Sequence, residues 1–431
     1  MAIIERNRYL EKIKKLMDNG QVKIITGIRR CGKSFFLNVI FKNYLRNIGV
    51  SDEQIVSLDL DDNINARYRN PFELSGYLRD KVKDTTKRFY LLIDEIQNVK
   101  SVSNPYLDGE TIGFIDVLNG LKNLPNVDVY VTGSNSKMLS SDIATEFRGR
   151  GDIIALSPLT YEEFYAAYPG EKRFAWREFI MYGGMPKVLS IESHEDKARY
   201  LSDLFRLIYI KDVIDRNKLK ADESVLDELL NVISSGVGSL TYPTKIADTF
   251  QSVRKLKIKN TTISNYLDCF IDAFVLSKAI RYDIKGRSYI DTPLKYYFTD
   301  IGLRNAKINF RQQEENHIME NVIYNELKAR GFSVDVGVVP LRKKDETGAL
   351  KYSQLEVDFV VNRGEKRYYI QSALTVADEN KRLQEINSLN RIDDTFAKIV
   401  ITRDNTLPWQ DENGVQYVYV EDFLLETINR L

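Results

Sequence analysis

Eight residues near the N-terminus have the composition and spacing of a loop that binds nucleotide phosphates. Gly27–Ser34 reads GIRRCGKS and matches the pattern GxxxxGK[ST]. Glycines at positions 27 and 32 let the backbone curl so that its N–H groups face phosphate oxygens, and the helix that follows adds the positive end of its dipole. Lys33 is expected to reach the β- and γ-phosphates, and the Ser34 hydroxyl to coordinate Mg²⁺. The loop therefore predicts ATP and Mg²⁺ as cofactors, with a chance match in a structural turn as the alternative.

The other side chains of this loop have alternative roles. Arg29 and Arg30 could face phosphate or point to solvent. Cys31 fits a small packing residue better than a redox switch, because the loop needs only a small side chain there. We take the nucleotide-binding residues to be Gly27, Ile28, Arg29, Arg30, Cys31, Gly32, Lys33, Ser34 and Phe35.

Two carboxylates supply the second half of the predicted site. Asp94 and Glu95 follow the apolar residues 89–93, and ligands of open α/β sheets bind at the carboxyl ends of the strands. Asp94 is expected to hold the Mg²⁺ shell through water, as a Walker-B aspartate does, and so shares the metal with Ser34. Glu95 is placed to polarise the attacking water as a general base. Either carboxylate alone would be an ordinary acid at a strand end.

Two further pairs of polar residues are candidates for contact with the transferred phosphate. Ser134 and Asn135 follow the strand predicted at 127–132, where they could sense the γ-phosphate or form an ordinary turn. Arg148 and Arg150 could stabilise charge on the transferring phosphoryl group, within one chain or from a neighbouring subunit. Surface arginines at a helix end are the alternative. The catalytic candidates are thus Asp94, Glu95, Ser134, Asn135, Arg148 and Arg150.

Alternating strand-like and helix-like patterns predict a parallel α/β sheet that holds these residues. Strands are expected at 22–26, 55–60, 89–94, 127–132 and 152–156. A helix-periodic apolar stretch follows the phosphate loop, which is the context that this motif requires. The strand at 55–60 lies between the two motif-bearing strands, as in ATPases that carry a catalytic glutamate.

Composition limits the classes of protein that this chain can belong to. At about 150 residues per domain, 431 residues suggest about three domains. The chain has 62 Lys+Arg and 61 Asp+Glu, a net charge of +1, so it is not a general polyanion binder. Two cysteines exclude a disulfide scaffold, and two histidines exclude a His-rich metal centre. No signal peptide or long apolar run is visible, so we expect a cytoplasmic location and no membrane partner.

Helical patterns follow the predicted sheet. Thr160 and Glu163 have the spacing of a capping box, which marks the start of a helix. Three helical patterns between residues 222 and 274, followed by two strands around Gly286, have the order of a winged-helix unit.

A short basic stretch precedes the third of these helices. Its residues are Arg254, Lys255, Lys257 and Lys259. Together with the polar start of the helix they could contact DNA phosphates and base edges, or form a solvated charged loop. DNA is therefore a candidate partner, bound through the winged-helix-like unit.

Several motifs together resemble those of one known family. They are GIRRCGKS, LLIDEIQNV, VYVTGSNSKML and FRGR, followed by LSPLTYEEF and GGMPKVL. The chain is similar to predicted bacterial and archaeal AAA-type ATPases that carry a C-terminal domain of unknown function. The resemblance spans nearly the whole chain and implies ATP binding, hydrolysis, a helical lid and a winged-helix-like segment. It implies no particular substrate.

The C-terminal residues resemble the layout of restriction-endonuclease-like nucleases. Glu320 on a predicted helix and Asp358 in a predicted strand would be two of the acidic residues, and the next strand reads YYIQSA. Such nucleases carry E-x-K in that strand to bind Mg²⁺ and activate water. Here Gln371-Ser372-Ala373 replaces it, which removes one charge and the lysine. We therefore expect a degenerate nuclease-like domain, kept for binding or assembly and without nuclease activity.

The predicted fold class is an α/β P-loop NTPase sheet with a helical lid, followed by a winged-helix-like unit and an α+β nuclease-like domain. The expected boundaries are 1–157 for the ATPase core, 158–220 for the lid, 221–305 for the winged-helix-like unit and 306–431 for the last domain. The expected function is a Mg²⁺-dependent ATPase that acts as a molecular switch. The alternatives are a DNA-processing ATPase with nuclease activity and an ATP-binding adaptor with little turnover. Expected partners are ATP, DNA, and a protein partner or a second copy of the chain.

Overall fold

The computed structural model describes residues 3–133, 151–208, 212–214, 223–255, 257–311, 314–344 and 350–431. The chain divides into two compact units. The first consists of residues 1–158 with 272–274, and the second of residues 159–271 with 275–431. In the part of the chain that is described, no helix combines the length and the apolar character needed to cross a membrane.

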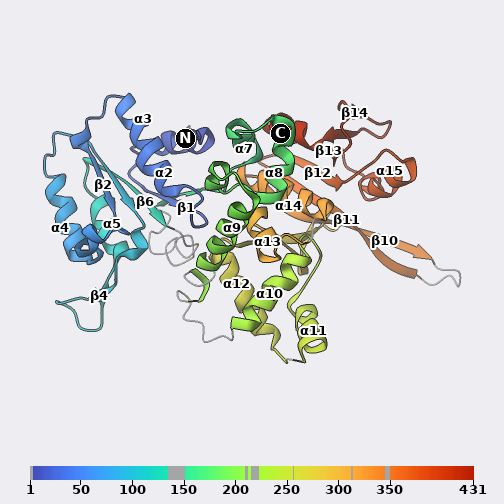
Figure 1. The fold of residues 1–431 in the computed structure, drawn as a ribbon, viewed down its shortest axis with the longest axis horizontal. Coiled ribbons are helices and arrows are strands. Elements are labelled where there is room, and N and C mark those ends of the chain that lie inside the picture. Colours follow the sequence, from blue (N-terminus) through green and yellow to red (C-terminus); the bar gives the residue numbers. More distant parts are fainter. Residues whose placement is uncertain are drawn as a thin grey trace. The chain divides into compact units, whose positions relative to one another are not determined.

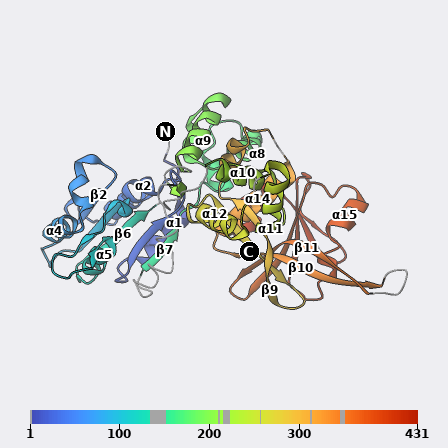
Figure 2. The same cartoon turned by 90° about the horizontal axis from the view of Figure 1, so that it is seen from below.

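A five-stranded parallel sheet forms the centre of the first unit (Figures 1 and 2), with the strand order β2-β3-β6-β1-β7. The strands are β1 (Val22–Thr26), β2 (Ile55–Asp59), β3 (Phe89–Asp94), β6 (Val127–Gly133) and β7 (Gly151–Ala155). All four pairings between them are parallel. The predicted α/β fold of this unit is confirmed.

The strand that separates the two motif-bearing strands is not the expected one. In the sheet, β6 lies between β1 and β3, whereas β2 (residues 55–59) lies at the outer edge. Crossover connections between parallel strands carry the chain past neighbouring positions, so the order of strands along the chain does not give their order in the sheet. The prediction that residues 55–60 form the inserted strand is wrong, although an inserted strand is present.

Helices cover both faces of this sheet. The unit's helical segments are α1 (Asn7–Leu16), α2 (Lys33–Phe35), the π-helical segment Phe36–Phe41, α3 (Lys42–Asn47), α4 (Pro71–Lys81) and α5 (Phe114–Lys122). Buried residues of α4 and α5 pack with Val129 and Val131 of β6. Tyr130 lies between those two residues and faces the opposite side, where its ring lies 4.6 Å from that of Phe41. The helix after the phosphate loop is therefore packed on one face of the sheet.

The second unit is built on an eight-stranded mixed sheet with the order β14-β15-β13-β12-β11-β10-β8-β9. The strands are β8 (Leu276–Asp283), β9 (Ser288–Phe298), β10 (Ser333–Lys344), β11 (Leu350–Arg363), β12 (Lys366–Ala373), β13 (Ala397–Thr402), β14 (Trp409–Gln410) and β15 (Val415–Tyr419). The hairpin of β8 and β9 joins this sheet through a parallel pairing of β8 with β10. The sheet is thus continuous across residue 305.

Three helices precede the β8–β9 hairpin in the expected order. They are α10 (Glu223–Ser235), α11 (Pro243–Arg254) and α12 (Asn260–Asp272). The apolar residues that predicted α10 and α12, such as Leu229 and Leu267, are buried. The unit's other helices are α7 (Tyr161–Ala167), α8 (Ala175–Tyr182), α9 (His194–Ile208), α13 (Ile301–Lys307), α14 (Glu315–Ala329), α15 (Glu379–Glu385) and α16 (Val420–Leu425).

Strands β10 and β11 continue as a two-stranded arm beyond the rest of the sheet (Figures 1 and 2). Residues 342–352 are a polar stretch that composition predicts as a loop, yet Arg342 pairs with Tyr352 and Lys344 with Leu350. Antiparallel pairing is made by backbone N–H and C=O groups, which polar residues carry as well as apolar ones. A polar composition therefore does not exclude strand pairing at the two ends of this stretch.

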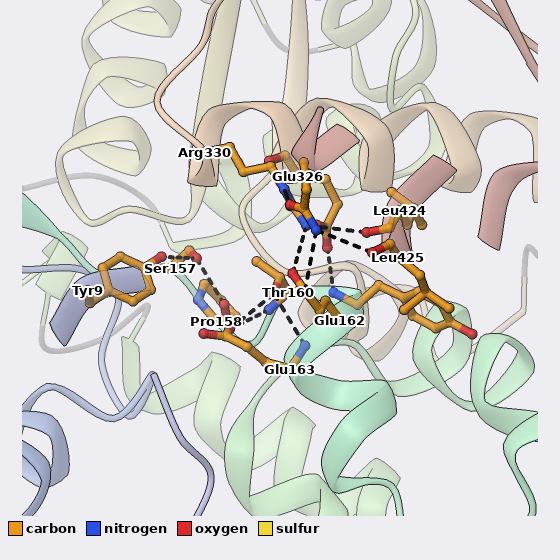
Figure 3. Close-up of polar contacts among 12 residues, drawn as sticks. Tyr9, Ser157, Pro158, Thr160, Glu162, Glu163, Glu326, Arg330, Leu424 and Leu425 are labelled. Atoms are coloured by element: carbon orange, nitrogen blue, oxygen red, sulfur yellow. Dashed lines mark hydrogen bonds and ion pairs between the residues drawn. The ribbon is translucent and has the colours of Figure 1, made fainter. Parts of the chain in front are cut away.

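A buried arginine connects three helices of the second unit (Figure 3). Arg330, directly after α14, forms an ion pair with Glu326, and its Nη2 lies 3.3 Å from a Glu162 carboxylate oxygen of α7. The same Nη2 donates to the Leu424 carbonyl of α16 at 3.3 Å. Glu326 also accepts from the Tyr161 backbone N–H at 2.5 Å.

The capping box predicted at Thr160 and Glu163 is confirmed at the start of α7.

Replacing this arginine should destabilise the second unit. In Arg330→Met the Glu326 carboxylate stays buried without its cation, which costs about 3–5 kcal/mol of the free energy of unfolding. Adding Glu326→Gln removes the uncompensated charge, keeps an oxygen for Tyr161, and should restore part of the loss. Denaturant unfolding of the single and the double variant measures the two free energies of unfolding.

The exposed pair of Arg430 and Glu426 is the matched control, with side chains 78% and 68% exposed. Arg430→Met should change the free energy of unfolding by less than about 1 kcal/mol. Equal effects of Arg330→Met and Arg430→Met would contradict the role given to Arg330.

Candidate functional site

The phosphate loop connects β1 to α2, as its motif predicts. Gly27 and Gly32 have φ angles of 147° and 105°, which suit glycine. Lys33 is only 3% exposed, and its ammonium donates to the carbonyls of Gly27 at 3.0 Å and Ile28 at 3.1 Å. The Lys33 ammonium therefore lies at the centre of the phosphate loop. In loops of this motif, phosphate oxygens bind at that position. The geometry therefore suits an anion.

The first residue of the loop lies against the backbone that follows β7. A Cβ atom at Gly27 would lie 2.1 Å from the Leu156 carbonyl oxygen, so no other residue fits without moving the loop. The Leu156 N–H donates to the Thr26 carbonyl at 2.7 Å, and the Cys31 thiol lies 3.4 Å from the Leu156 carbonyl. Burial raises the pKa of the Cys31 thiol. These contacts suit a packing role for Cys31.

Arg6, which the sequence does not single out, supports the loop from outside. This buried residue directly precedes α1. Its guanidinium donates to the Cys31 carbonyl at 3.3 Å and the Ser157 carbonyl at 2.7 Å. Tyr9 of α1 lies one helical turn further on, and its hydroxyl lies 2.7 Å from that of Ser157. The loop is therefore held between α1 and the end of β7.

Asp94 lies at the carboxyl end of β3 and is 3% exposed. Its carboxylate accepts a hydrogen bond from the Thr132 hydroxyl and interacts with the Ser34 hydroxyl. Burial raises the pKa of Asp94, while these two hydroxyls and the Lys33 charge oppose the rise. The structure therefore brings together the two oxygens, from Ser34 and Asp94, that were predicted to share a magnesium ion.

Thr132 is the residue of this site that sequence reasoning missed. Its hydroxyl donates to Asp94 and accepts from the backbone N–H of Glu95 at 2.9 Å. Glu95 has a φ of 53°, and its carboxylate accepts from the Gln97 amide. A threonine at the end of a buried strand carries no sequence signal beyond β-propensity, so only the neighbouring position of β6 reveals this role.

Other predicted residues lie around this centre or outside the described part of the chain. Gly32 and the Arg29 side chain are half-buried, and Ile28 is buried. Arg30, Ser34 and Phe35 are exposed. The candidate sensors Ser134 and Asn135 and the candidate arginines Arg148 and Arg150 lie in residues 134–150, outside the described residues.

The residues present fit a magnesium nucleotide. The Ser34 hydroxyl and the Asp94 carboxylate are hard oxygen donors of the kind that Mg²⁺ takes beside phosphate oxygens and water. Lys33 supplies a positive charge next to them. The fold and this arrangement define a P-loop NTPase domain.

Comparison with known proteins agrees with this class. Residues 19–165 match the profile of an AAA domain, and residues 173–314 match a domain of unknown function, DUF8612. An uncharacterized protein of Haemophilus influenzae is 31% identical over 430 residues, which cover 99% of each chain. The chain belongs to the same family as this protein.

Two more distant similarities were found. An uncharacterized protein of Methanocaldococcus jannaschii is 28% identical over 416 residues, or 90% of this chain and 84% of that protein. The solved structure of the Aeropyrum pernix ORC1 protein in complex with DNA is 11% identical, covering 72% of this chain and 93% of that chain. The TM-score of this similarity is 0.29.

The second unit brings together the acidic residues predicted at its C-terminal end. Glu320 of α14 and Asp358 of β11 both face the ammonium of Lys295, at 2.8 and 3.6 Å. The Gln371 side-chain oxygen accepts from the Asp358 N–H at 3.3 Å. Burial, followed by the Glu320 charge, raises the pKa of Asp358 to about 7.

Lys295 and Glu356 are members of this cluster that sequence reasoning missed. A Glu356 carboxylate oxygen lies 2.6 Å from the Lys295 ammonium. Glu356 and Asp358 are two residues apart on β11, so the period of a strand could have placed both on one face. Lys295 comes from β9, which no local motif connects to β11 or α14. A lysine is therefore present in the cluster although Ala373 occupies the position where the motif expects one.

The hydroxyl of Thr132 should matter for turnover of magnesium ATP. In Thr132→Val the buried Asp94 carboxylate loses a donor and the Glu95 N–H loses its acceptor. An unsatisfied buried group costs about 1–3 kcal/mol, so turnover should fall about tenfold or more. Thr132→Ser keeps the hydroxyl and serves as the control.

Phosphate release at saturating magnesium ATP measures this effect. Equal turnover of the valine and serine variants would contradict the role given to the Thr132 hydroxyl.

Proposed function

We propose that this protein binds ATP with Mg²⁺ and hydrolyses it, and that the nucleotide state acts as a switch for the second unit. The observation that carries the proposal is that Lys33 and Ser34, at the start of α2, lie beside Asp94, at the end of β3. The AAA-domain match over residues 19–165 supports it.

The residues have separate tasks in the proposed reaction. Lys33 exchanges its two carbonyl partners for phosphate oxygens and fixes their position. Ser34 and Asp94 would hold Mg²⁺, which neutralises charge on the β- and γ-phosphates when it is bound. Glu95 accepts a proton from the attacking water, and Thr132 fixes the backbone from which Glu95 projects.

The proposed switch rests on how the predicted lid is built into the second unit. Its first helix, α7, is joined to α14 and α16 through Arg330 and Glu326. Tyr161 of α7 also donates its hydroxyl hydrogen to Glu421 of α16. A change transmitted to α7 would therefore reach the C-terminal helix directly, without a flexible connection.

Two substitutions separate ATP binding from hydrolysis. Lys33→Ala should abolish binding of a fluorescent ATP analogue, because the charge facing the phosphates is lost. Glu95→Gln should bind the analogue as the wild type does and lose phosphate release by about a hundredfold or more, since the general base is gone.

Surface substitution Lys83→Ala is the control, because that side chain is exposed in the first unit and pairs with exposed Asp80 at 3.2 Å. Turnover that persists in Glu95→Gln would contradict the assignment of Glu95 as general base. Binding of the ATP analogue by Lys33→Ala would contradict the proposed nucleotide site.

A second candidate function is DNA binding by the winged-helix-like unit. The observation that favours it is the exposure of Lys255, Lys257 and Lys259 directly before α12, whose first turns carry exposed Thr261 and Asn265. A cavity of about 340 Å³ opens beside these turns, lined by hydroxyl and amide side chains of α11 and α12. Lysines that contact phosphates and polar side chains that reach base edges are the two parts of such an interface.

Neutralising the three lysines should weaken DNA binding and its dependence on salt. With Lys255, Lys257 and Lys259 changed to Gln, the slope of log affinity against log salt should fall by about 0.9 for each DNA phosphate that a lysine no longer neutralises. The same change at Lys81, Lys83 and Lys87, which are also exposed, is the matched control.

Fluorescence anisotropy with a duplex at several salt concentrations measures the slope. An unchanged slope in the first variant, or an equal decrease in both, would reject this interface.

A further inference from the structure

The ammonium of Lys295 lies where three carboxylates converge. It is 2.6 Å from Glu356, 2.8 Å from Glu320 and 3.6 Å from Asp358, and its side chain is 3% exposed. Carboxylate oxygens arranged around one point are ligands that a hard divalent cation takes. Here a side chain of the protein occupies that point.

Other protein donors reach two of these carboxylates. Glu320 accepts from the Tyr297 hydroxyl at 2.7 Å, in addition to Lys295. Asp358 accepts from the Ser372 N–H at 2.8 Å, and the Gln371 oxygen accepts from the Asp358 N–H. His317 Nδ1 lies 4.0 Å from the second Glu320 oxygen. Tyr297 and the Ser372 backbone therefore hold two of the three carboxylates in addition to Lys295.

The surroundings keep the lysine in place. Gly238 packs its backbone on Glu320, and a Cβ atom there would lie 3.2 Å from the carboxylate. Of the three carboxylates only Glu356 reaches water to a large extent, with a side chain 33% exposed. Withdrawing the ammonium would leave Glu320 and Asp358 buried without a cation, which is strongly unfavourable.

We infer that Lys295 is the permanent cation of this centre, that it excludes divalent ions from the wild-type protein, and that its removal creates a site for Mg²⁺ or Mn²⁺. An ammonium and a divalent ion cannot share one position, because their charges repel strongly at such distances. Through its contacts with Glu320, Glu356 and Asp358, the lysine connects β9 to α14 and β11, as a bound metal ion would connect the elements that carry its ligands. This role is separate from the proposed ATPase activity.

Binding of Mn²⁺ to the full-length, nucleotide-free protein tests the inference. Wild type and Lys295→Met are titrated in parallel and followed by electron paramagnetic resonance of the free ion. The methionine variant should gain one Mn²⁺ per chain, with an affinity at least tenfold above that of the wild type. Adding Asp358→Asn should remove the gain. Any weak binding at the phosphate loop is common to all these proteins, because none of the substitutions lies there.

Lys23 provides a matched control. Its ammonium is fully buried and lies 2.5 Å from Asp128, with which it forms an ion pair in the first unit. Lys23→Met removes a buried lysine that faces one carboxylate rather than three, so it should gain no Mn²⁺ site. A gain equal to that of Lys295→Met would overturn the inference.

The wild-type protein gives a test that does not depend on the folding of Lys295→Met. Its thermal midpoint should be the same in EDTA and in millimolar Mn²⁺. A midpoint raised by Mn²⁺ in the wild type and not in Glu320→Gln would overturn the inference, as would a folded Lys295→Met that gains no Mn²⁺.

Discussion

The contact between the Gly27 backbone and the Leu156 carbonyl is the constraint on which the nucleotide site depends. It exists because β7 pairs with β1, which brings Leu156 beside the start of the phosphate loop. The loop can therefore curl only away from the Leu156 carbonyl. In this curl the Lys33 ammonium donates to the carbonyls of Gly27 and Ile28, which belong to the same loop. A strand far away in the chain thus determines the shape of a motif that looks local in the sequence.

Features that depend on neighbouring residues could be predicted from the sequence. The apolar runs 22–26 and 89–94 became β1 and β3 with the expected ends, and Thr160 and Glu163 formed their capping box. Features that depend on distant segments could not. The position of β6 in the sheet, the bridge that Thr132 makes to Asp94, and the arrival of Lys295 from β9 all arise from pairings between strands that carry no common pattern.

Buried ion pairs connect several elements of the second unit, in addition to its apolar packing. Arg330 satisfies Glu326 and the end of α16, and Lys295 satisfies carboxylates from α14 and β11. Both centres lie on α14 or at its end, so this helix connects the helices of the predicted lid to the mixed sheet. Buried ion pairs lose much of their energy to desolvation, but they tolerate few alternative arrangements of their partners. They favour one relative placement of these elements within the unit.

The parallel pairing of β8 with β10 has a consequence for the order in which the protein is made. Arg281 to Asp283 of β8 pair with Val336 to Val338 of β10. During synthesis the β8–β9 hairpin leaves the ribosome before β10, α14 and the rest of the sheet exist. Until then the edge of β8 is open, and such an edge is a template for pairing with another chain. The nascent chain therefore passes through a stage in which the three helices α10, α11 and α12 can fold while their hairpin still lacks its neighbouring strand.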